Sequence, residues 1–170
     1  MTYGIVIFPS VDIQDEANAL RKRYDPKYPY ISPHITLKYP FQMDAQERDE
    51  TVKALEEIAQ ETEPFQIEVT KISSFSPVSN AIYLKVEDNE HLNKLNEKMH
   101  EGVFDAHREH AFIPHITIAQ DLPSDEYSDI YSSLRMRQIH FTDTIDRFQL
   151  CKQLENGNWT VDTTFHFGKK

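Results

Sequence analysis

The sequence is poor in cysteine and glycine and has no long apolar run. Cys151 is its single cysteine in 170 residues, so no disulfide can form within the chain, and a disulfide-stabilised scaffold is excluded. Four glycines, all isolated, are too few for a glycine-rich phosphate-binding loop. No window approaches the roughly 18 apolar residues of a membrane span, and the first residues lack a signal-peptide pattern. We therefore expect a cytoplasmic protein with no membrane partner.

A surplus of positive charge is also missing. The chain carries 28 acidic and 18 basic residues, for a formal net charge of −10. Proteins that hold long nucleic acids draw most of their affinity from neutralising phosphates with lysine and arginine. The acidic balance therefore argues against long duplex nucleic acid as a partner, but it leaves room for a small phosphate-bearing ligand in a local pocket.

What the sequence does contain is a regular alternation of strand and helix patterns. Stretches rich in β-branched and aromatic residues predict strands at 3–8, 34–39, 64–75, 81–86, 115–119, 139–154 and 159–167. Apolar residues at helical spacing predict helices at 12–24, 44–62, 89–104 and 124–136. Ser124 is expected to cap the last helix, and Asn156-Gly157 predicts a type I′ hairpin turn.

The order of these segments suggests an internal duplication. Ile5 and Ile82 are 77 positions apart, His34 and His115 are 81 apart, and Phe65 and Ile145 (which we take as equivalents in the third strand of each half) are 80 apart. Near-equal offsets are the signature of a repeat. We expect one bilobal domain over residues 1–170, with approximate repeats 1–79 and 80–170 related by a pseudo-twofold axis.

A short motif occurs once in each half. Pro33-His34-Ile35-Thr36-Leu37 recurs as Pro114-His115-Ile116-Thr117-Ile118. Side chains of a strand alternate between its two faces, so each histidine shares a face with the threonine two residues later. The isoleucine and its apolar neighbour form the opposite, buried face. If the halves are related by a twofold axis, the two polar faces can meet across one cleft.

The residues on these polar faces suit the chemistry of a phosphodiester. Histidine has an ordinary pKa near 6.5, so one imidazole can take a proton from the attacking group while the other gives a proton to the leaving oxygen. Threonine hydroxyls can donate hydrogen bonds to the non-bridging phosphate oxygens, where charge develops. This scheme needs no metal and no cofactor.

The two tetrads resemble the paired His-x-Thr-x motifs that define the 2H phosphoesterase superfamily. The segments Tyr3-Gly4-Ile5-Val6-Ile7-Phe8-Pro9 and Gln153-Leu154-Glu155-Asn156-Gly157-Asn158-Trp159 are most similar to its bacterial YjcG-like branch of predicted phosphoesterases. The resemblance covers the whole chain. It implies an α+β fold with two pseudo-twofold-related lobes, each a small, mostly antiparallel sheet with helices on the outside, and an active cleft between them.

The resemblance also implies a function and four site residues. Members of the superfamily act on 2′,3′-cyclic phosphates, 2′-5′ linkages or related nucleotides, so we expect a small nucleotide or RNA-end phosphodiester as substrate. It implies catalytic roles for His34 and His115, which we assign as proton donor and proton acceptor, respectively. It places Thr36 and Thr117 at the phosphate.

Several other residues are weaker candidates. Lys38 shares a strand face with His34 and could contact the phosphate, while the second repeat has Ala119 at that place. Two roles are possible for four aromatic residues, stacking on a base or ordinary packing in the core or a loop: Tyr30, Tyr39, Phe75 and Tyr83. We expect the basic cluster Arg21, Lys22 and Arg23 to lie at a helix end, where positive charge interacts favourably with the helix dipole.

Two other classes of function remain open. The same cleft could belong to a non-catalytic module that binds a cyclic nucleotide or phosphate without turning it over. The chain has eight histidines, so a metallohydrolase is a further alternative. The cluster from His107 to His110 has neither of the spacings that zinc proteases use, which weighs against that alternative.

Overall fold

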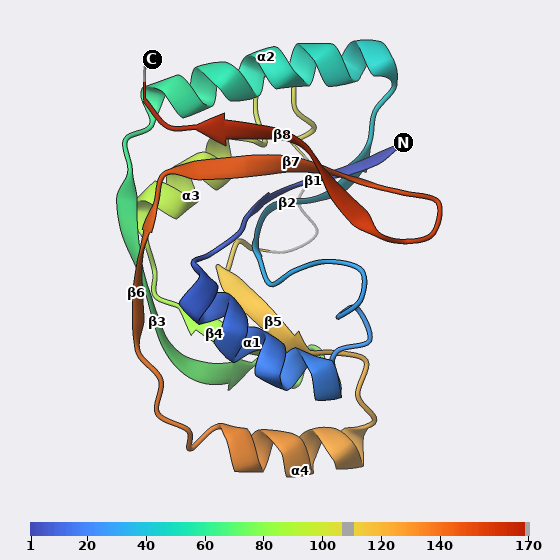
Figure 1. The fold of residues 1–170 in the computed structure, drawn as a ribbon, viewed down its shortest axis with the longest axis vertical. Coiled ribbons are helices and arrows are strands. Elements are labelled where there is room, and N and C mark those ends of the chain that lie inside the picture. Colours follow the sequence, from blue (N-terminus) through green and yellow to red (C-terminus); the bar gives the residue numbers. More distant parts are fainter. Residues whose placement is uncertain (107–110, 169–170) are drawn as a thin grey trace.

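The computed structural model describes residues 1–106 and 111–168 (Figure 1). Within them the strands are β1 (Thr2–Ile7), β2 (Ile35–Gln42), β3 (Phe65–Ser74), β4 (Ile82–Val86), β5 (His115–Ala119), β6 (Phe141–Ile145), β7 (Arg147–Gln153) and β8 (Trp159–His166). The helices are α1 (Val11–Tyr24), α2 (Ala45–Glu61), α3 (Glu90–Lys98) and α4 (Ser124–Leu134). None of these helices is both long enough and apolar enough to cross a bilayer.

The strands form two antiparallel sheets of four strands each. One sheet has the order β2-β1-β7-β8 and the other has the order β5-β4-β3-β6. The two orders match position by position, with the strand of the first histidine motif at the edge of one sheet and that of the second motif at the edge of the other. This arrangement confirms the predicted α+β fold with two related lobes.

The lobes do not follow the two halves of the sequence. The third strand, β3, pairs with β4 and β6, and β7 pairs with β1 and β8, so each sheet uses strands from both sides of position 80. Phe65 and Ile145 are opposite each other on adjacent strands, so treating them as equivalents was wrong. The boundary near residue 80 remains a prediction about a repeat in the sequence. In the structure, β7 and β8 occupy the places in one sheet that β3 and β6 occupy in the other.

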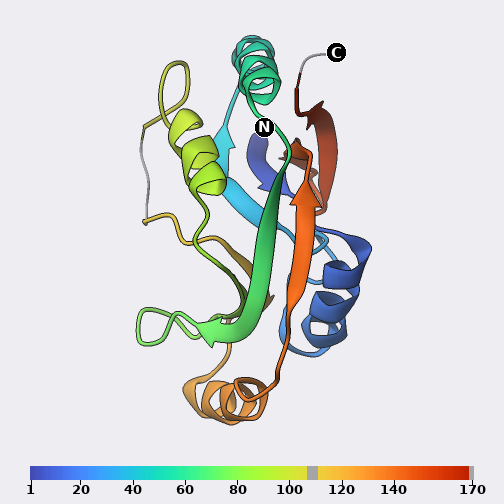
Figure 2. The same ribbon diagram turned by 90° about the vertical axis from the view of Figure 1, so that its left-hand side faces the viewer.

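The long extended segment predicted at 139–154 serves both sheets. It is divided at Asp146 into β6 and β7, which belong to different sheets. Figure 2 shows β6 running beside β3 before the chain passes to the other sheet. A single stretch of sequence therefore joins the two lobes, in addition to the connection from α2 to β3.

Two of the helices pack against the sheet opposite to the one whose strand they follow. Helix α1 follows β1 of the first sheet but packs against β5 of the second, and α3 follows β4 of the second sheet but contacts β2 of the first. Helix α2 lies over β8, and α4 contacts β3 at the opposite end of the molecule (Figure 1). One continuous apolar core therefore connects both sheets, with fully buried side chains that include Ile5, Ile35, Ile82, Ile116 and Phe148.

Helix ends explain most differences from the predicted boundaries. Asp44 caps α2 and forms a capping box with Glu47, so this helix begins as expected. Ser124 is the first residue of α4 and makes no capping hydrogen bond, so its predicted capping role is wrong: Pro123 holds that position. Helix α3 is capped by Asn89 and ends at Lys98, well before the predicted residue 104.

The hairpin between β7 and β8 is present, but its turn differs from the prediction. A type I′ turn needs positive φ at two successive residues. Here Gly157 has φ of 90° while Asn156 does not have a positive φ, and the Gly157 N–H donates to the Leu154 carbonyl at 3.0 Å. The turn is therefore a three-residue loop that ends in a left-handed glycine.

Candidate active site

The two histidine motifs occupy equivalent places at the edges of the two sheets. His34 immediately precedes β2 and His115 is the first residue of β5. The isoleucine after each histidine is fully buried, whereas Thr36 and Thr117 are partly exposed on the opposite face. The predicted alternation is therefore confirmed in both strands, and it turns each histidine and its threonine away from the core.

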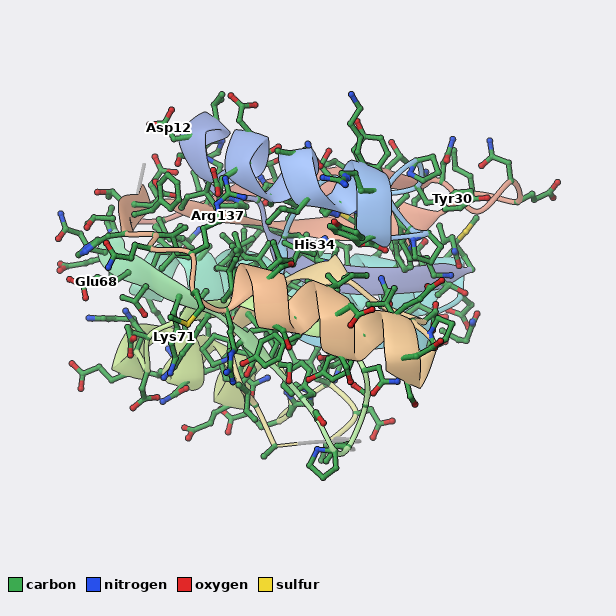
Figure 3. The ribbon with its side chains drawn as sticks, turned by 90° about the horizontal axis from the view of Figure 1, so that it is seen from below. Asp12, Tyr30, His34, Glu68, Lys71 and Arg137 are labelled. Atoms are coloured by element: carbon green, nitrogen blue, oxygen red, sulfur yellow. The ribbon has the colours of Figure 1, made fainter. Side chains whose placement is uncertain are left out.

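Both polar faces open into one cavity. The cavity has a volume of about 650 Å³ and is lined by His34, Thr36, His115 and Thr117. Its walls come from both sheets because β2 and β5, the two edge strands, contact each other. Seen from below, His34 lies between α1 and α4, near the middle of the molecule (Figure 3). The structure thus brings together the four residues that the sequence singles out.

The two imidazoles are held in the same way. His34 Nδ1 lies 2.8 Å from the Ser32 carbonyl oxygen, and His115 Nδ1 lies 2.6 Å from the Ile113 carbonyl oxygen. A carbonyl oxygen only accepts hydrogen bonds, so each Nδ1 carries the proton. In the neutral ring, Nε2 is then the unprotonated nitrogen, and it is the atom through which each histidine can accept or return a proton.

Burial lowers the pKa of both histidines. Desolvation is the largest cause for His34, whose pKa falls to about 4, and the nearby charges of Arg21 and His115 act in the same direction. The bond to Ser32 and the charge of Asp25 oppose this shift. Desolvation also lowers the pKa of His115, against the effect of its bond to Ile113. At neutral pH, His34 is therefore neutral, and a role as proton donor requires a nearby anion that raises its pKa.

Aromatic rings pack around His115. Phe75 meets its imidazole edge-on with ring centroids 4.9 Å apart, and Tyr83 does so at 5.3 Å. Phe75 and Tyr83 therefore hold the ring of His115 instead of lining the cavity as base-stacking residues. Tyr30 and Tyr39, the other two aromatic candidates, do line the cavity.

Lys38 is buried at the side of the cleft, with 4% of its surface exposed. Its Nζ donates to the Asp105 carbonyl oxygen at 2.9 Å and lies 5.4 Å from the centre of the Phe41 ring. The side chain also contributes to the cavity wall. Ala119, its counterpart on β5, is fully buried, so any contribution of Lys38 is confined to one side of the site.

The basic cluster at the end of α1 divides into two parts. Lys22 and Arg23 are exposed, as expected of charged residues at a helix end. Arg21 is 2% exposed, lines the cavity and is paired with Asp25 at 3.2 Å. Arg21 lies in the last turn of α1, where its charge suits the helix end as expected, but its burial and its pairing with Asp25 were not predicted.

The far end of the cavity is built by the β7–β8 hairpin and the loop before β2. Trp159 and Asn156 line it, and the Trp159 N–H donates to the Tyr30 carbonyl at 2.9 Å. A side-chain carbon at Gly157 would lie 3.3 Å from the ring of Tyr30, so this position suits glycine for packing as well as for its φ. Sequence reasoning missed these hairpin residues, because only the fold brings them beside the histidines.

The other histidines within the described part of the chain show no sign of a shared metal site. Within residues 1–106 and 111–168, no group of three or more histidine, cysteine, aspartate or glutamate side chains is placed to hold a metal ion. His91 stacks on Phe65, and His100 bonds to the Asn96 carbonyl. The weak metal candidate between His107 and His110 lies outside the described residues.

The chain matches the profile of a known protein family. The profile of the 2′-5′ RNA ligase superfamily matches residues 9–157, a span that includes both histidine motifs. Among curated proteins, the chain is 56% identical to "Putative phosphoesterase OB1230" of Oceanobacillus iheyensis over 169 residues, or 99% of each chain. It is also 56% identical to "Putative phosphoesterase GK0864" of Geobacillus kaustophilus, covering 100% of this chain and 98% of the relative.

Solved structures share the fold at low sequence identity. TT0787 of Thermus thermophilus superposes with a TM-score of 0.74 over 100% of both chains at 17% identity. Escherichia coli LigT complexed with 3′-AMP superposes with a TM-score of 0.73 over 98% of both chains at 14% identity. Other LigT structures of the same fold are complexed with NADP+ and with ATP.

Proposed function

The chain belongs to the 2′-5′ RNA ligase superfamily, the 2H phosphoesterases, and we propose that it cleaves, or reversibly forms, a phosphodiester on a small nucleotide or RNA end. A 2′,3′-cyclic phosphate and a 2′-5′ linkage are the proposed substrates. The observation that carries the proposal is the matched pair of imidazoles in one cavity, each with Nδ1 bonded to a backbone carbonyl and Nε2 left for proton transfer.

In the proposed hydrolysis of a cyclic phosphate, His115 acts as the base. Its Nε2 takes a proton from a water molecule as the water oxygen forms a bond to phosphorus. His34 acts as the acid: the bond from phosphorus to one ribose oxygen breaks, and that oxygen receives the proton from Nε2 of His34. Each Nδ1 keeps its proton and its carbonyl partner throughout, so the ring does not need to turn. In the reverse reaction the two histidines exchange roles.

Bound phosphate supplies the charge that this scheme requires. An anion beside an imidazole favours its protonated form, so substrate binding raises the pKa of His34 from about 4. Thr36 and Thr117 are proposed to donate to the non-bridging oxygens. Lys38 is proposed as a third phosphate ligand, because its side chain is part of the cavity wall and carries a positive charge.

The cavity suits a ligand of nucleotide size. Its volume of about 650 Å³ lies within the usual range for small-molecule sites. Three lining residues are basic, Arg21, Lys27 and Lys38, and two are acidic, Asp25 and Glu155. The cleft is therefore locally cationic although the chain carries a net charge of −10. The aromatic residues at its far end can stack on a base.

The known complexes of LigT agree with this size. LigT is complexed with 3′-AMP, ATP and NADP+ in solved structures, all of which contain an adenine nucleotide. We propose a ligand of the same class for this chain.

The proposal is tested by a panel of 2′,3′-cyclic mononucleotides and 2′-5′-linked dinucleotides with EDTA present. Wild type is expected to turn over at least one member, and His34→Ala and His115→Ala are each expected to lose about 10²–10⁴-fold of that rate. His140→Ala is the matched control, because His140 is exposed and lies before β6. Equal rates in wild type and both active-site variants would contradict the proposal.

One observation favours a second candidate, a module that binds a cyclic nucleotide or phosphate without turnover. With a pKa of about 4, the imidazole of His34 is neutral at neutral pH and its Nε2 carries no proton, which suits hydrogen bonding better than acid catalysis. Calorimetry with cyclic mononucleotides, followed by product analysis of the same samples, separates the two. Tight binding with no product after long incubation would favour the binding module.

A further inference from the structure

A buried carboxylate lies where the two lobes meet beside the cleft. Asp25 is 7% exposed and follows directly after α1. Its oxygens accept hydrogen bonds from Arg21 Nε at 3.2 Å, from the Lys27 backbone N–H at 2.8 Å and from Gln120 Nε2 at 2.9 Å. Such a group is costly to bury, and its three donors offset that cost.

One arm of this network leads to His34. The guanidinium that pairs with Asp25 also donates from Nη2 of Arg21 to the Ile31 carbonyl at 2.6 Å. The next residue is Ser32, whose carbonyl accepts the hydrogen bond from His34 Nδ1. The position of that carbonyl, and with it the orientation and tautomer of the imidazole, therefore depends on the segment that Arg21 holds.

The other arm leads to the strand of His115. Gln120 is the residue immediately after β5, and besides its side-chain bond to Asp25 its backbone N–H donates to the Tyr24 carbonyl at 3.4 Å. The end of α1 is thus tied to the end of the strand that begins with His115. Since β5 belongs to one sheet and β2 to the other, the network spans the two lobes.

We infer that Asp25 is a positioning residue. Through Arg21 it sets the orientation of His34, and through Gln120 it sets the placement of His34 relative to the strand of His115. This inference rests on the proposed function for its catalytic consequence, but not for its structural one. Among the hydrogen bonds of residues 1–106 and 111–168, none joins His115 or its carbonyl partner Ile113 to this network, so the two imidazoles should respond differently when the network is broken.

The tautomer of His34 provides a readout that does not depend on activity. Nitrogen-15 NMR of the whole protein distinguishes Nδ1–H from Nε2–H imidazole. Wild type is expected to show Nδ1–H at both histidines. Arg21→Lys keeps the charge beside Asp25 but shortens the donor that reaches Ile31, and Asp25→Asn removes the anion that orients Arg21. In both variants we expect an Nε2–H population at His34 only.

Kinetics tests the catalytic consequence. Arg21→Lys, Asp25→Asn and Gln120→Ala are each expected to lower kcat by about 10- to 100-fold with KM changed by less than about threefold, because misplacement of a proton-transfer group costs rate more than binding. Asp25→Ala combined with Gln120→Ala should be no slower than Asp25→Ala alone, because the side chain of Gln120 acts through its hydrogen bond to Asp25.

The matched control is another ion pair, the partly buried Arg48–Asp162, at 2.6 Å. It joins α2 to β8 and neither residue lines the cavity. Asp162→Asn should lower the unfolding temperature but leave both tautomers and kcat unchanged. His34 remaining fully Nδ1–H in Arg21→Lys and Asp25→Asn would overturn the inference whatever the activity. If the two variants lose the Nδ1–H tautomer of His34 but wild type shows no turnover, the inference is supported and the proposed function is not.

Discussion

His34 and His115 make the same hydrogen bond to the same kind of partner. Each Nδ1 donates to the backbone carbonyl two residues earlier, at 2.8 Å to Ser32 and 2.6 Å to Ile113. Two residues 81 positions apart in sequence thus share a tautomer and an immediate backbone contact. The neighbours of the two imidazoles differ. Arg21 and Asp25 lie close enough to His34 to influence its charge, whereas the rings of Phe75 and Tyr83 pack against His115.

The threonines should matter less than the histidines, but measurably. Thr36→Val and Thr117→Val remove the hydroxyl at nearly constant shape, and each is expected to lower kcat/KM by about 10- to 100-fold through the loss of one donor to the phosphate. Thr36→Ser and Thr117→Ser keep the hydroxyl and should retain most of the activity. Steady-state kinetics on one cyclic mononucleotide suffices. Equal rates for the valine and serine variants would show that the hydroxyls do not contact the reacting phosphate.

The hairpin end of the cleft should contribute to binding of the nucleoside. Trp159→Ala removes an aromatic wall of the cavity and is expected to raise KM for cyclic mononucleotides by about 10-fold or more, with a smaller effect on kcat. A phosphodiester without a base, such as bis(4-nitrophenyl) phosphate, provides the comparison. A similar rise of KM for both substrates would mean that Trp159 shapes the cleft without contacting the base.

The lowered pKa of His34 makes stability depend on pH. The folded state holds this pKa at about 4 and the unfolded state near 6.5, so between these values the unfolded chain binds more protons. Stability from this group is complete above pH 6.5 and is lost as the pH falls towards 4, by roughly 3 kcal/mol at most. The lowered pKa of His115 acts in the same direction.

Urea unfolding at pH 7 and pH 4.5 measures this effect. His34→Asn should reduce the difference in unfolding free energy between the two pH values, while His140→Asn should leave it unchanged, because His140 is exposed. The same pH difference in wild type and His34→Asn would contradict a desolvated imidazole at this position.

The sequence predicted the local part of the site well. Alternation in a strand depends only on neighbouring residues, so Ile35 and Ile116 identify the buried faces and leave His34 and His115 on the polar ones. Because the motif occurs once in each half, the sequence also predicted that the two polar faces meet across one cleft. The family resemblance, now supported by the superfamily match, correctly implied the bilobal fold.

The parts that sequence reasoning missed depend on contacts between distant segments. The partner strands of β3 and β7 are set by non-local pairing, which no periodic pattern encodes, and this is why Phe65 was matched to its own cross-strand neighbour. In the sequence Arg21 cannot be told apart from Lys22 and Arg23 at the same helix end, and only the folded structure shows that it is buried and paired with Asp25. Side-chain networks of this kind leave no spacing signal in the sequence.

The central claim, proton transfer by the two histidines, is tested most directly by the pH dependence of kcat at a saturating concentration of a cyclic mononucleotide, with EDTA present, because kcat reports the pKa values of the substrate complex. Wild type is expected to give a bell-shaped profile, because one histidine must be neutral and the other protonated. His115→Ala should lose the fall in rate at low pH, and His34→Ala should lose the fall at high pH. The opposite pattern would exchange their roles as donor and acceptor. Two variants that keep both limbs of the profile at near wild-type rates would contradict the account.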